Sequence, residues 1–252
     1  MADKIATREA YGNALAEFGA LNENIVVLDA DLAEATKTCV FKKKFPERFF
    51  DCGIAENNMF GVAAGLATTG KIPFASTFAM FAAGRSFDQV RNSIGYPHLN
   101  VKICATHGGV SVGEDGATHQ CCEDMALMRT IPGMVVMNPA DAVEARAAVE
   151  AAINYNGPVY IRFGRLPVAI INDNEDYKFE IGKGVKLCDG DDVTIVANGL
   201  MVEQALIAKD MLKEEGICAS VINIHTIKPL DTELLISEAK KTGVIVNKRG
   251  MQ

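Results

Sequence analysis

Apolar segments with the length of buried strands alternate along this chain with segments that have apolar residues at helical spacing. Helical spacing occurs at residues 7–21, 56–70, 78–97 and 141–155. The strand-like segments are NIVVLDADL (24–32), KIPFAST (71–77), VKICATH (101–107), MVVMNP (134–139) and GPVYIRFGR (157–165). This alternation predicts an α/β fold with a mostly parallel sheet that helices cover on both faces.

Polar residues follow three of these segments, after VVLDAD, VKICATH and VYIRFGR. In an open parallel sheet, ligands bind beyond the carboxyl ends of the strands, which meet at one edge. The loop within Ile103 to Met128 combines histidines, acidic residues, glycines and two adjacent cysteines. We therefore expect the three polar loops to form one shared site.

Polar residues and glycines interrupt the alternation near residues 168–186, which predicts a domain boundary. We expect a first domain at 1–170, a linker at 171–186 and a second α/β domain at 187–252. The second domain is predicted to contain strands at 193–199, 218–224 and 243–246, a helix at 202–215 and a short helix after Pro229. This second part is short for an independent doubly wound domain.

Charge and composition exclude several classes of partner. The 25 basic and 32 acidic residues give a net charge of −7 without a long basic run, which disfavours nucleic acid and anionic membranes. The start lacks the pattern of a secretory signal, and no apolar run approaches the roughly 20 residues of a membrane span. Seven cysteines without C-x-x-C spacing suit reduced thiols. We expect a cytoplasmic protein that binds a small molecule or another protein.

Spacing alone leaves several interpretations of the 103–128 loop open. Histidines, carboxylates and cysteines supply metal-ligand types, but no second pair completes a tetrahedral zinc site. A cysteine nucleophile would pair Cys104 or Cys121 with a histidine, and nothing singles out one thiol. The loop could also be a polar connection, although loops at strand carboxyl ends often carry function.

Three stretches together resemble the transketolase family, specifically the part that corresponds to its C-terminal half. They are DCGIAENNMFGVAAGLATTGKIPFASTFAMF (51–81), THGGVSVGEDGATHQ (106–120) and GPVYIRFGR (157–165). Their order and spacing match the family from about Ile5 to Val246. The resemblance implies a pyrimidine-binding domain with a mostly parallel sheet, followed by a shortened α/β C-terminal domain of the transketolase type.

The resemblance also implies that thiamin diphosphate is the cofactor. Glu56 matches the glutamate that hydrogen-bonds the aminopyrimidine ring, where a poorly solvated carboxyl group can share a proton with the ring nitrogen. An alternative role for Glu56 is to cap the helix that it begins. Phe81 matches the residue that stacks on the ring, Phe78 lines the same pocket one helical turn away, and Asp31 matches an acidic residue near the cofactor. Gly84 stands where the family often has a tyrosine.

The substrate residues come from the same resemblance. Histidines and carboxylates that face a sugar hydrogen-bond its hydroxyls, and arginines grip its phosphate. The implied substrate-binding residues are Arg8, His107, Asp115, His119 and Arg165, and the implied catalytic residues are Glu56, His107 and His119. Two departures affect substrate choice: the family often reads THDS where this chain has Gly108 and Gly109, and a phosphate-binding serine aligns with Ala35, near Thr36.

The partner prediction follows from what this sequence lacks. The family's other half contributes a G-D-G…N motif that holds Mg²⁺ against the diphosphate, and no such motif occurs in this sequence. We therefore expect no metal ligand in this chain, an N-terminal transketolase subunit that supplies them, and self-association into a heterotetramer. The expected reaction moves a two-carbon ketol unit between sugar phosphates. The alternatives are a 2-oxo acid dehydrogenase β subunit, a 1-deoxyxylulose-5-phosphate synthase-like subunit, or a non-catalytic assembly subunit.

Overall fold

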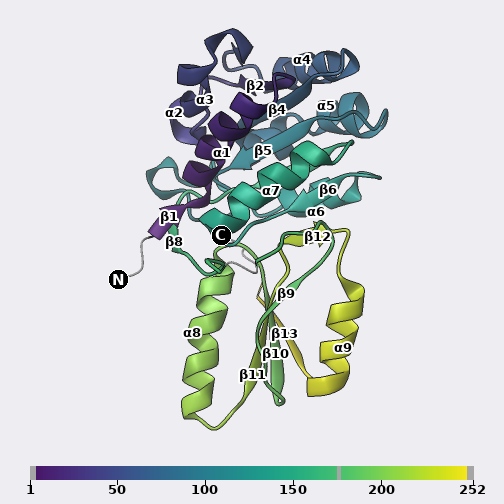
Figure 1. Ribbon diagram of the computed structural model, residues 1–252. Coiled ribbons are helices and arrows are strands. Elements are labelled where there is room, and N and C mark those ends of the chain that lie inside the picture. The colour runs from purple at the N-terminus through teal and green to yellow at the C-terminus, as the bar shows by residue number, and fades with distance from the viewer. Residues whose placement is uncertain (1–3, 175–176, 249–252) are drawn as a thin grey trace.

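The structure is a computed structural model that describes residues 4–174 and 177–248. Its larger sheet has seven strands in the order β12-β6-β7-β5-β4-β2-β3 (Figure 1). Six of these strands are mutually parallel. The six are β2 Ile25–Asp29, β3 Phe49–Asp51, β4 Ile72–Phe78, β5 Lys102–Thr106, β6 Val135–Met137 and β7 Val159–Arg162. This arrangement confirms the predicted parallel sheet.

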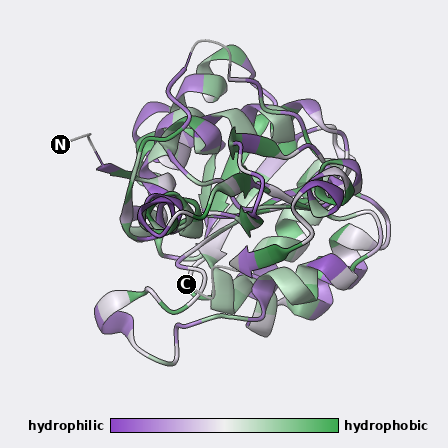
Figure 2. Ribbon diagram, turned by 90° about the horizontal axis from the view of Figure 1, so that it is seen from below, coloured by the Kyte–Doolittle hydropathy of each residue, from purple (hydrophilic) through white to green (hydrophobic). Residues whose placement is uncertain are grey.

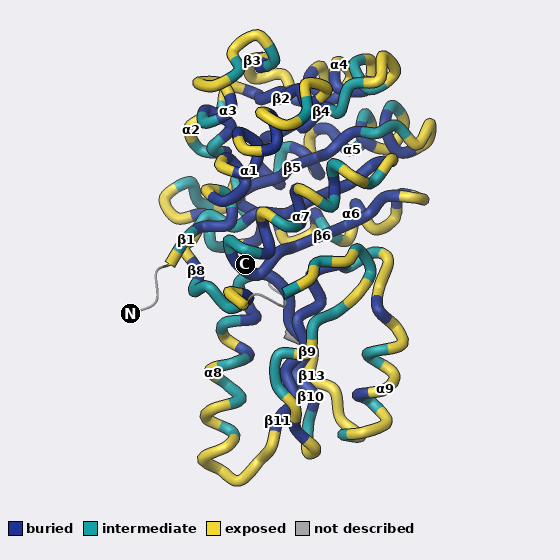
Figure 3. The backbone as a smooth tube through the Cα atoms, viewed as in Figure 1, coloured by how far each residue is buried: buried dark blue, intermediate teal, exposed yellow. Residues whose placement is uncertain are grey.

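Helices cover both faces of this sheet, because successive strand residues point to opposite sides. In β2, Ile25 and Val27 face α1 (Thr7–Leu21), α3 (Cys39–Lys44) and α7 (Ala142–Asn154), whereas Val26 and Leu28 face α4 (Glu56–Thr68) and α6 (Asp124–Thr130). Every residue of β2 is buried, as a strand between two helical layers requires. Apolar residues accordingly gather in the central strands (Figure 2), and the sheet is the most buried part of the larger domain (Figure 3).

The prediction of one helix over residues 78–97 is wrong. Phe78 ends β4, and two segments of wide π-type turns follow, η2 (Phe81–Arg85) and η3 (Val90–Gly95), separated by the short α5 (Phe87–Gln89). Each π-type turn holds more residues than an α-helical turn, and such turns are frequent at functional sites. Phe78 and Phe81 are therefore not one helical turn apart, although their rings still stack.

The second sheet has the order β13-β10-β11-β9, in which only β9 is antiparallel. Its strands are β9 Val185–Cys188, β10 Val193–Ala197, β11 Ala219–Asn223 and β13 Ile245–Lys248, with α8 (Met201–Glu214) and α9 (Thr232–Thr242). The predicted strands and the first helix are present, and α9 is longer than the short helix expected. In the described residues β13 is an edge strand. Exposed Val246 in this strand and exposed Val244 just before it lie next to exposed Met211 on α8.

Strand β12 (Thr226–Lys228) crosses back from the second part of the chain and pairs antiparallel with β6. A separate two-stranded sheet pairs β1 (Lys4–Ala6) antiparallel with β8 (Pro167–Ala169), both within the first part of the chain. The predicted limits of domain and linker remain a prediction, but the two parts share one sheet. Among the helices within 4–174 and 177–248, none is both long and apolar enough to cross a bilayer.

A buried cluster of carboxylates joins the two parts at the start of α7. Asp141 accepts a hydrogen bond from the Glu144 amide at 2.8 Å and so caps the N-terminus of α7. Glu144 accepts from Tyr177 Oη at 2.6 Å and from Asn223 Nδ2 of β11 at 2.9 Å. Burial raises the pKa of Glu144 to about 7. Nearby, Asn138 Nδ2 donates to Asn198 Oδ1 at 2.8 Å.

Candidate active site

The predicted cofactor carboxylate, Glu56, is the first residue of α4 and is only 2% exposed. Nη1 of Arg85 donates to its two carboxylate oxygens at 2.9 and 2.8 Å. The same guanidinium lies over the ring of Phe81, 4.4 Å from its centroid. The buried carboxylate and the aromatic ring are therefore adjacent and share one cation, Arg85, which the sequence analysis did not select.

Aromatic rings from β4, η2 and the loop after β5 form one cluster next to this carboxylate. Phe78 stacks on Phe81 with centroids 5.9 Å apart and on His107 at 3.9 Å. His119 meets Phe81 edge-on at 5.3 Å. Four of the residues predicted from the resemblance are thus brought together, although they come from three separate segments.

His107 is held in one orientation between two polar neighbours. Its Nδ1 lies 2.9 Å from Thr106 Oγ1, and its Nε2 lies 3.3 Å from Nη1 of Arg8. Because the guanidinium can only donate, Nε2 accepts and the ring proton sits on Nδ1. Burial, followed by the positive charges of Arg8 and Arg165, lowers the pKa of His107 to about 3. The imidazole is therefore neutral at physiological pH.

Two arginines lie on the other side of His107. Arg8, at the start of α1, also donates to Ala35 O at 2.9 Å. Burial and then the charge of Arg165 lower the pKa of Arg8. Arg165, just beyond β7, pairs with the exposed Glu114 at 2.8 Å. The two guanidinium groups repel each other, and Arg165 is paired with a carboxylate that is exposed and easily displaced. Such a pair of cations is a suitable site for a small anion.

The predicted acidic residues near the cofactor and the sugar are more exposed. Asp31 is exposed and has a left-handed backbone, with φ of 63°. Asp115 lies half-buried in the 3-10 turn Gly113–Asp115. The buried carboxylate near this edge is Asp29, which accepts hydrogen bonds from Thr36 Oγ1 at 2.7 Å and Thr38 Oγ1 at 2.8 Å. Sequence reasoning missed it, because only the folded loop brings these donors to it.

Cysteine and metal chemistry find no support in the geometry of the loop. Burial raises the pKa of both Cys104 and Cys121 to about 12, so these thiols stay protonated and are poor nucleophiles. All seven cysteines are free, as predicted. In residues 4–174 and 177–248, no group of three His, Cys, Asp or Glu side chains is arranged to hold a metal ion.

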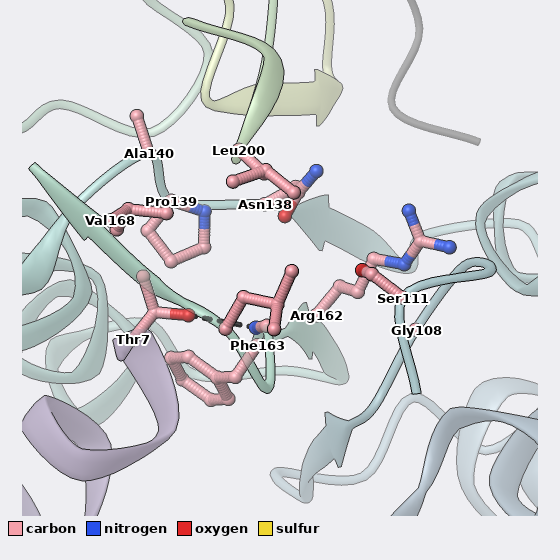
Figure 4. A pocket seen from close by; sticks show the side chains of 12 residues that line it. Thr7, Gly108, Ser111, Asn138, Pro139, Ala140, Arg162, Phe163, Val168 and Leu200 are labelled. Carbon is pink, nitrogen blue, oxygen red and sulfur yellow. Dashed lines mark hydrogen bonds between the residues drawn. The ribbon is translucent and has the colours of Figure 1, made fainter. Parts of the chain in front are cut away.

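A small cavity lies directly behind these residues, between the two parts of the chain (Figure 4). Three of its lining residues, Thr7, Gly108 and Gly164, are the chain neighbours of Arg8, His107 and Arg165. Thr7 Oγ1 accepts a hydrogen bond from the Gly164 amide at 2.7 Å. Asn138, just after β6, and Leu200, just before α8, line the opposite wall, so the second part of the chain contributes Leu200 to the back of the site.

Comparisons with known proteins decide the family. The chain matches the transketolase pyrimidine-binding domain over residues 3–169 and the transketolase C-terminal domain over residues 182–248. The chain belongs to the transketolase family. The resemblance and the fold class predicted from the sequence are confirmed, a pyrimidine-binding domain followed by a short C-terminal domain.

Relatives of this family member include a protein named as a C-terminal section and another named as a transketolase subunit. A Methanocaldococcus jannaschii protein named putative transketolase C-terminal section is 55% identical over 229 residues, which are 90% of this chain and 72% of that protein. A 6-deoxy-6-sulfo-D-fructose transketolase subunit of a Clostridium species is 45% identical over 95% of this chain and 74% of that protein. Human transketolase is 43% identical, and the match covers 95% of this chain but 38% of the human protein.

A solved structure described as a split gene transketolase, inactive beta4 tetramer, has a TM-score of 0.90 and 57% identity to this chain. The match covers 98% of this chain and 80% of that one. The chain covers most of the putative C-terminal section but little more than a third of human transketolase. It therefore corresponds to the C-terminal section of the family, with the pyrimidine-binding and C-terminal domains.

Proposed function

We propose that this chain is the C-terminal subunit of a split transketolase and acts with an N-terminal subunit. The observation that carries the proposal is the buried Glu56 carboxylate next to the Phe78–Phe81 ring pair. The names of the relatives support a division into two polypeptides. A heterotetramer of two copies of each subunit in the cytoplasm, as expected from the sequence, belongs to the same proposal.

The residues present fit thiamin diphosphate. A buried carboxyl group provides a partner for a ring nitrogen, and Phe81 would provide an aromatic face for stacking once Arg85, which lies over that ring, moves away. When bound, the cofactor would supply the carbon that carries the two-carbon unit. Glu56 would hold a proton at its carboxylate, and Arg85 would have to release that carboxylate. The ligands of Mg²⁺ are assigned to the partner subunit.

The remaining residues would bind and orient the sugar phosphate. Arg8 and Arg165 would bind its phosphate group, with Arg165 exchanging the exposed Glu114 for the substrate. The neutral His107 would accept a hydrogen bond from a sugar hydroxyl at Nε2 once Arg8 turns to the phosphate and gives up its 3.3 Å contact with that atom. His119 and Asp115 would contact further hydroxyls. Asp31 would lie near the cofactor, because it follows the carboxyl end of β2. The rings of Phe78 and Phe81 would exclude water.

Three alternative functions are tested against this proposal. A 2-oxo acid dehydrogenase β subunit and a 1-deoxyxylulose-5-phosphate synthase-like subunit would have the same type of cofactor carboxylate. A non-catalytic assembly subunit is favoured by one observation, the inactive tetramer described for the relative that is 57% identical. The relative that acts on a sulfosugar also leaves the sugar open, because its name specifies 6-deoxy-6-sulfo-D-fructose.

The test mixes this chain with a candidate N-terminal subunit and measures ketol transfer, oxo-acid decarboxylation and thiamin diphosphate binding by calorimetry. In the Glu56→Gln variant we expect turnover to fall by roughly 100-fold or more while subunit association is unchanged, because only the proton-holding carboxylate is lost. Glu150→Gln, the same change at an exposed site on α7, is the matched control. Equal loss of turnover and association in Glu56→Gln would assign Glu56 a structural role and refute the proposal.

A further inference from the structure

Gly108 is the first of the two residues at which this chain departs from the family's THDS pattern, and the structure explains this departure. A Cβ atom at Gly108 would collide with Nε of Arg162 and would lie 2.7 Å from its Cγ and 2.8 Å from its Cδ. The backbone of Gly108 has no left-handed φ, so glycine is needed here for space. The Arg162 side chain therefore occupies the volume that a side chain at position 108 would fill (Figure 4).

Arg162 ends β7 and is 2% exposed. Its Nε lies 3.0 Å from Oδ2 of Asp124, the fully buried first residue of α6, and its Nη2 donates to Cys121 O at 2.9 Å. Tyr160 Oη donates to the same Asp124 oxygen at 2.7 Å. The guanidinium is thus fixed from two directions, which is the condition under which a buried arginine constrains its neighbours.

The contacts of Arg162 lie at both ends of one loop. Gly109 and Cys121 exchange two backbone hydrogen bonds, of 2.7 and 2.9 Å, and close the loop that carries Asp115 and His119. Gly108, at the beginning of this loop, packs against the aliphatic part of Arg162, and Cys121, at its end, accepts the Nη2 bond. No other arginine described in the structure contacts both ends.

We propose that Arg162 is a positioning residue for the substrate loop, and that Gly108 is the substitution that admits it. The inference rests on the proposed function, because it assigns the loop to sugar binding. In the family's THDS pattern a side chain follows the histidine. In this chain position 108 has no side chain, and the buried guanidinium of Arg162, from the neighbouring strand, fills that volume. His107, which directly precedes Gly108, and His119 are held in register by this contact.

The test is a double-mutant cycle with Gly108→Ala and Arg162→Ala in the assembled enzyme. Each single variant raises the KM for sugar phosphate roughly tenfold or more, with a smaller change in kcat, because the loop is misplaced. The double variant matches Arg162→Ala alone, since the methyl group added at position 108 then meets no guanidinium. KM changes that multiply to about a hundredfold overturn the proposal. Gly65→Ala on α4 is the matched control, because a Cβ atom added there meets nothing within 4 Å.

A second measurement separates this proposal from the proposed function. Hydrogen exchange of the Gly109 and Cys121 amides in the chain itself needs neither cofactor nor activity, and both amides are protected by the bonds that close the loop. Arg162→Lys, which keeps a charge for Asp124 but lacks the planar fork, serves if Arg162→Ala does not fold. Faster exchange at both amides supports the inference, and unchanged exchange overturns it even if ketol transfer is absent.

Discussion

Asp29 provides the sharpest test of the electrostatics at this edge of the sheet. It ends β2, is fully buried, and accepts hydrogen bonds from the Leu32 amide at 2.6 Å and from the hydroxyls of Thr36 and Thr38. These bonds fix the short helix α2 (Ala33–Thr36), whose Ala35 carbonyl receives the Arg8 bond. The Asp29→Asn substitution keeps the shape of the side chain and removes its ionisation.

Burial raises the pKa of Asp29 to about 6, with the three hydrogen bonds opposing part of that rise. Between the ordinary value of about 3.9 and this value, the folded chain holds a proton that the unfolded chain has lost. The contribution of Asp29 to stability is therefore fully present below pH 4 and declines as the pH rises toward 6, by about 1.4 kcal/mol per pH unit. The total is about 3 kcal/mol, and Asp29→Asn lacks this term.

Urea unfolding of both proteins from about pH 4.5 to about pH 7.5 measures the difference directly. The stability of the wild type relative to Asp29→Asn should fall by about 2 kcal/mol over this range, since only the part of the window above pH 4.5 is sampled. Other titrating groups cancel in the difference. A difference that stays constant within about 0.5 kcal/mol would refute the claim that the Asp29 carboxylate is desolvated.

Two further changes test the ion pair between Arg85 and Glu56 and the junction between the two parts of the chain. Arg85→Gln frees the Glu56 carboxylate from its ion pair. Because Arg85 is half-exposed, the pair is weak, and we expect calorimetry to show that thiamin diphosphate binds the assembled enzyme about two- to fivefold more tightly. Weaker binding would contradict this expectation. Asn223→Ala removes a donor to Glu144 and should cost about 1.5–3 kcal/mol in urea unfolding, more than Asn198→Ala, which breaks a neutral amide pair. Because the pKa of Glu144 is about 7, the Asn223→Ala cost should grow from pH 6 to pH 8 as the acceptor ionises; a pH-independent cost would contradict it.

Local periodicity predicted the elements whose burial pattern is regular. Helix α1 has the predicted bounds, and α4, α7 and the parallel strands were found because their apolar residues repeat at the helical or the strand period. Residues 78–97 failed because two π-type segments, which hold more residues per turn, still place apolar side chains at nearly helical spacing. Strand β12 could not be predicted, since its partner β6 lies about 90 residues earlier and only the tertiary fold brings them together.

The site residues were named through the family resemblance, and their spacing left several chemistries open. What the structure adds is the set of groups that act on them: Arg85 on Glu56, Thr106 on His107, and Arg162 on the loop that carries His119. Each is an ordinary arginine or threonine in the sequence, without a motif of its own. Their roles depend on contacts between separate segments, which no periodicity encodes.

The distribution of charge explains how an acidic protein could bind the anionic substrate that we propose. The net charge of −7 disfavours polyanions at long range, but Arg8 and Arg165 lie together at the carboxyl edge of the sheet beside a neutral His107. Of the carboxylates at this edge, Glu114 is exposed and pairs with Arg165. In the proposed function, a phosphate group would displace the exposed Glu114 carboxylate from Arg165 and gain two guanidinium partners. The local field would then favour a small anion that can enter the loop cluster, whereas the net negative charge would disfavour a large polyanion.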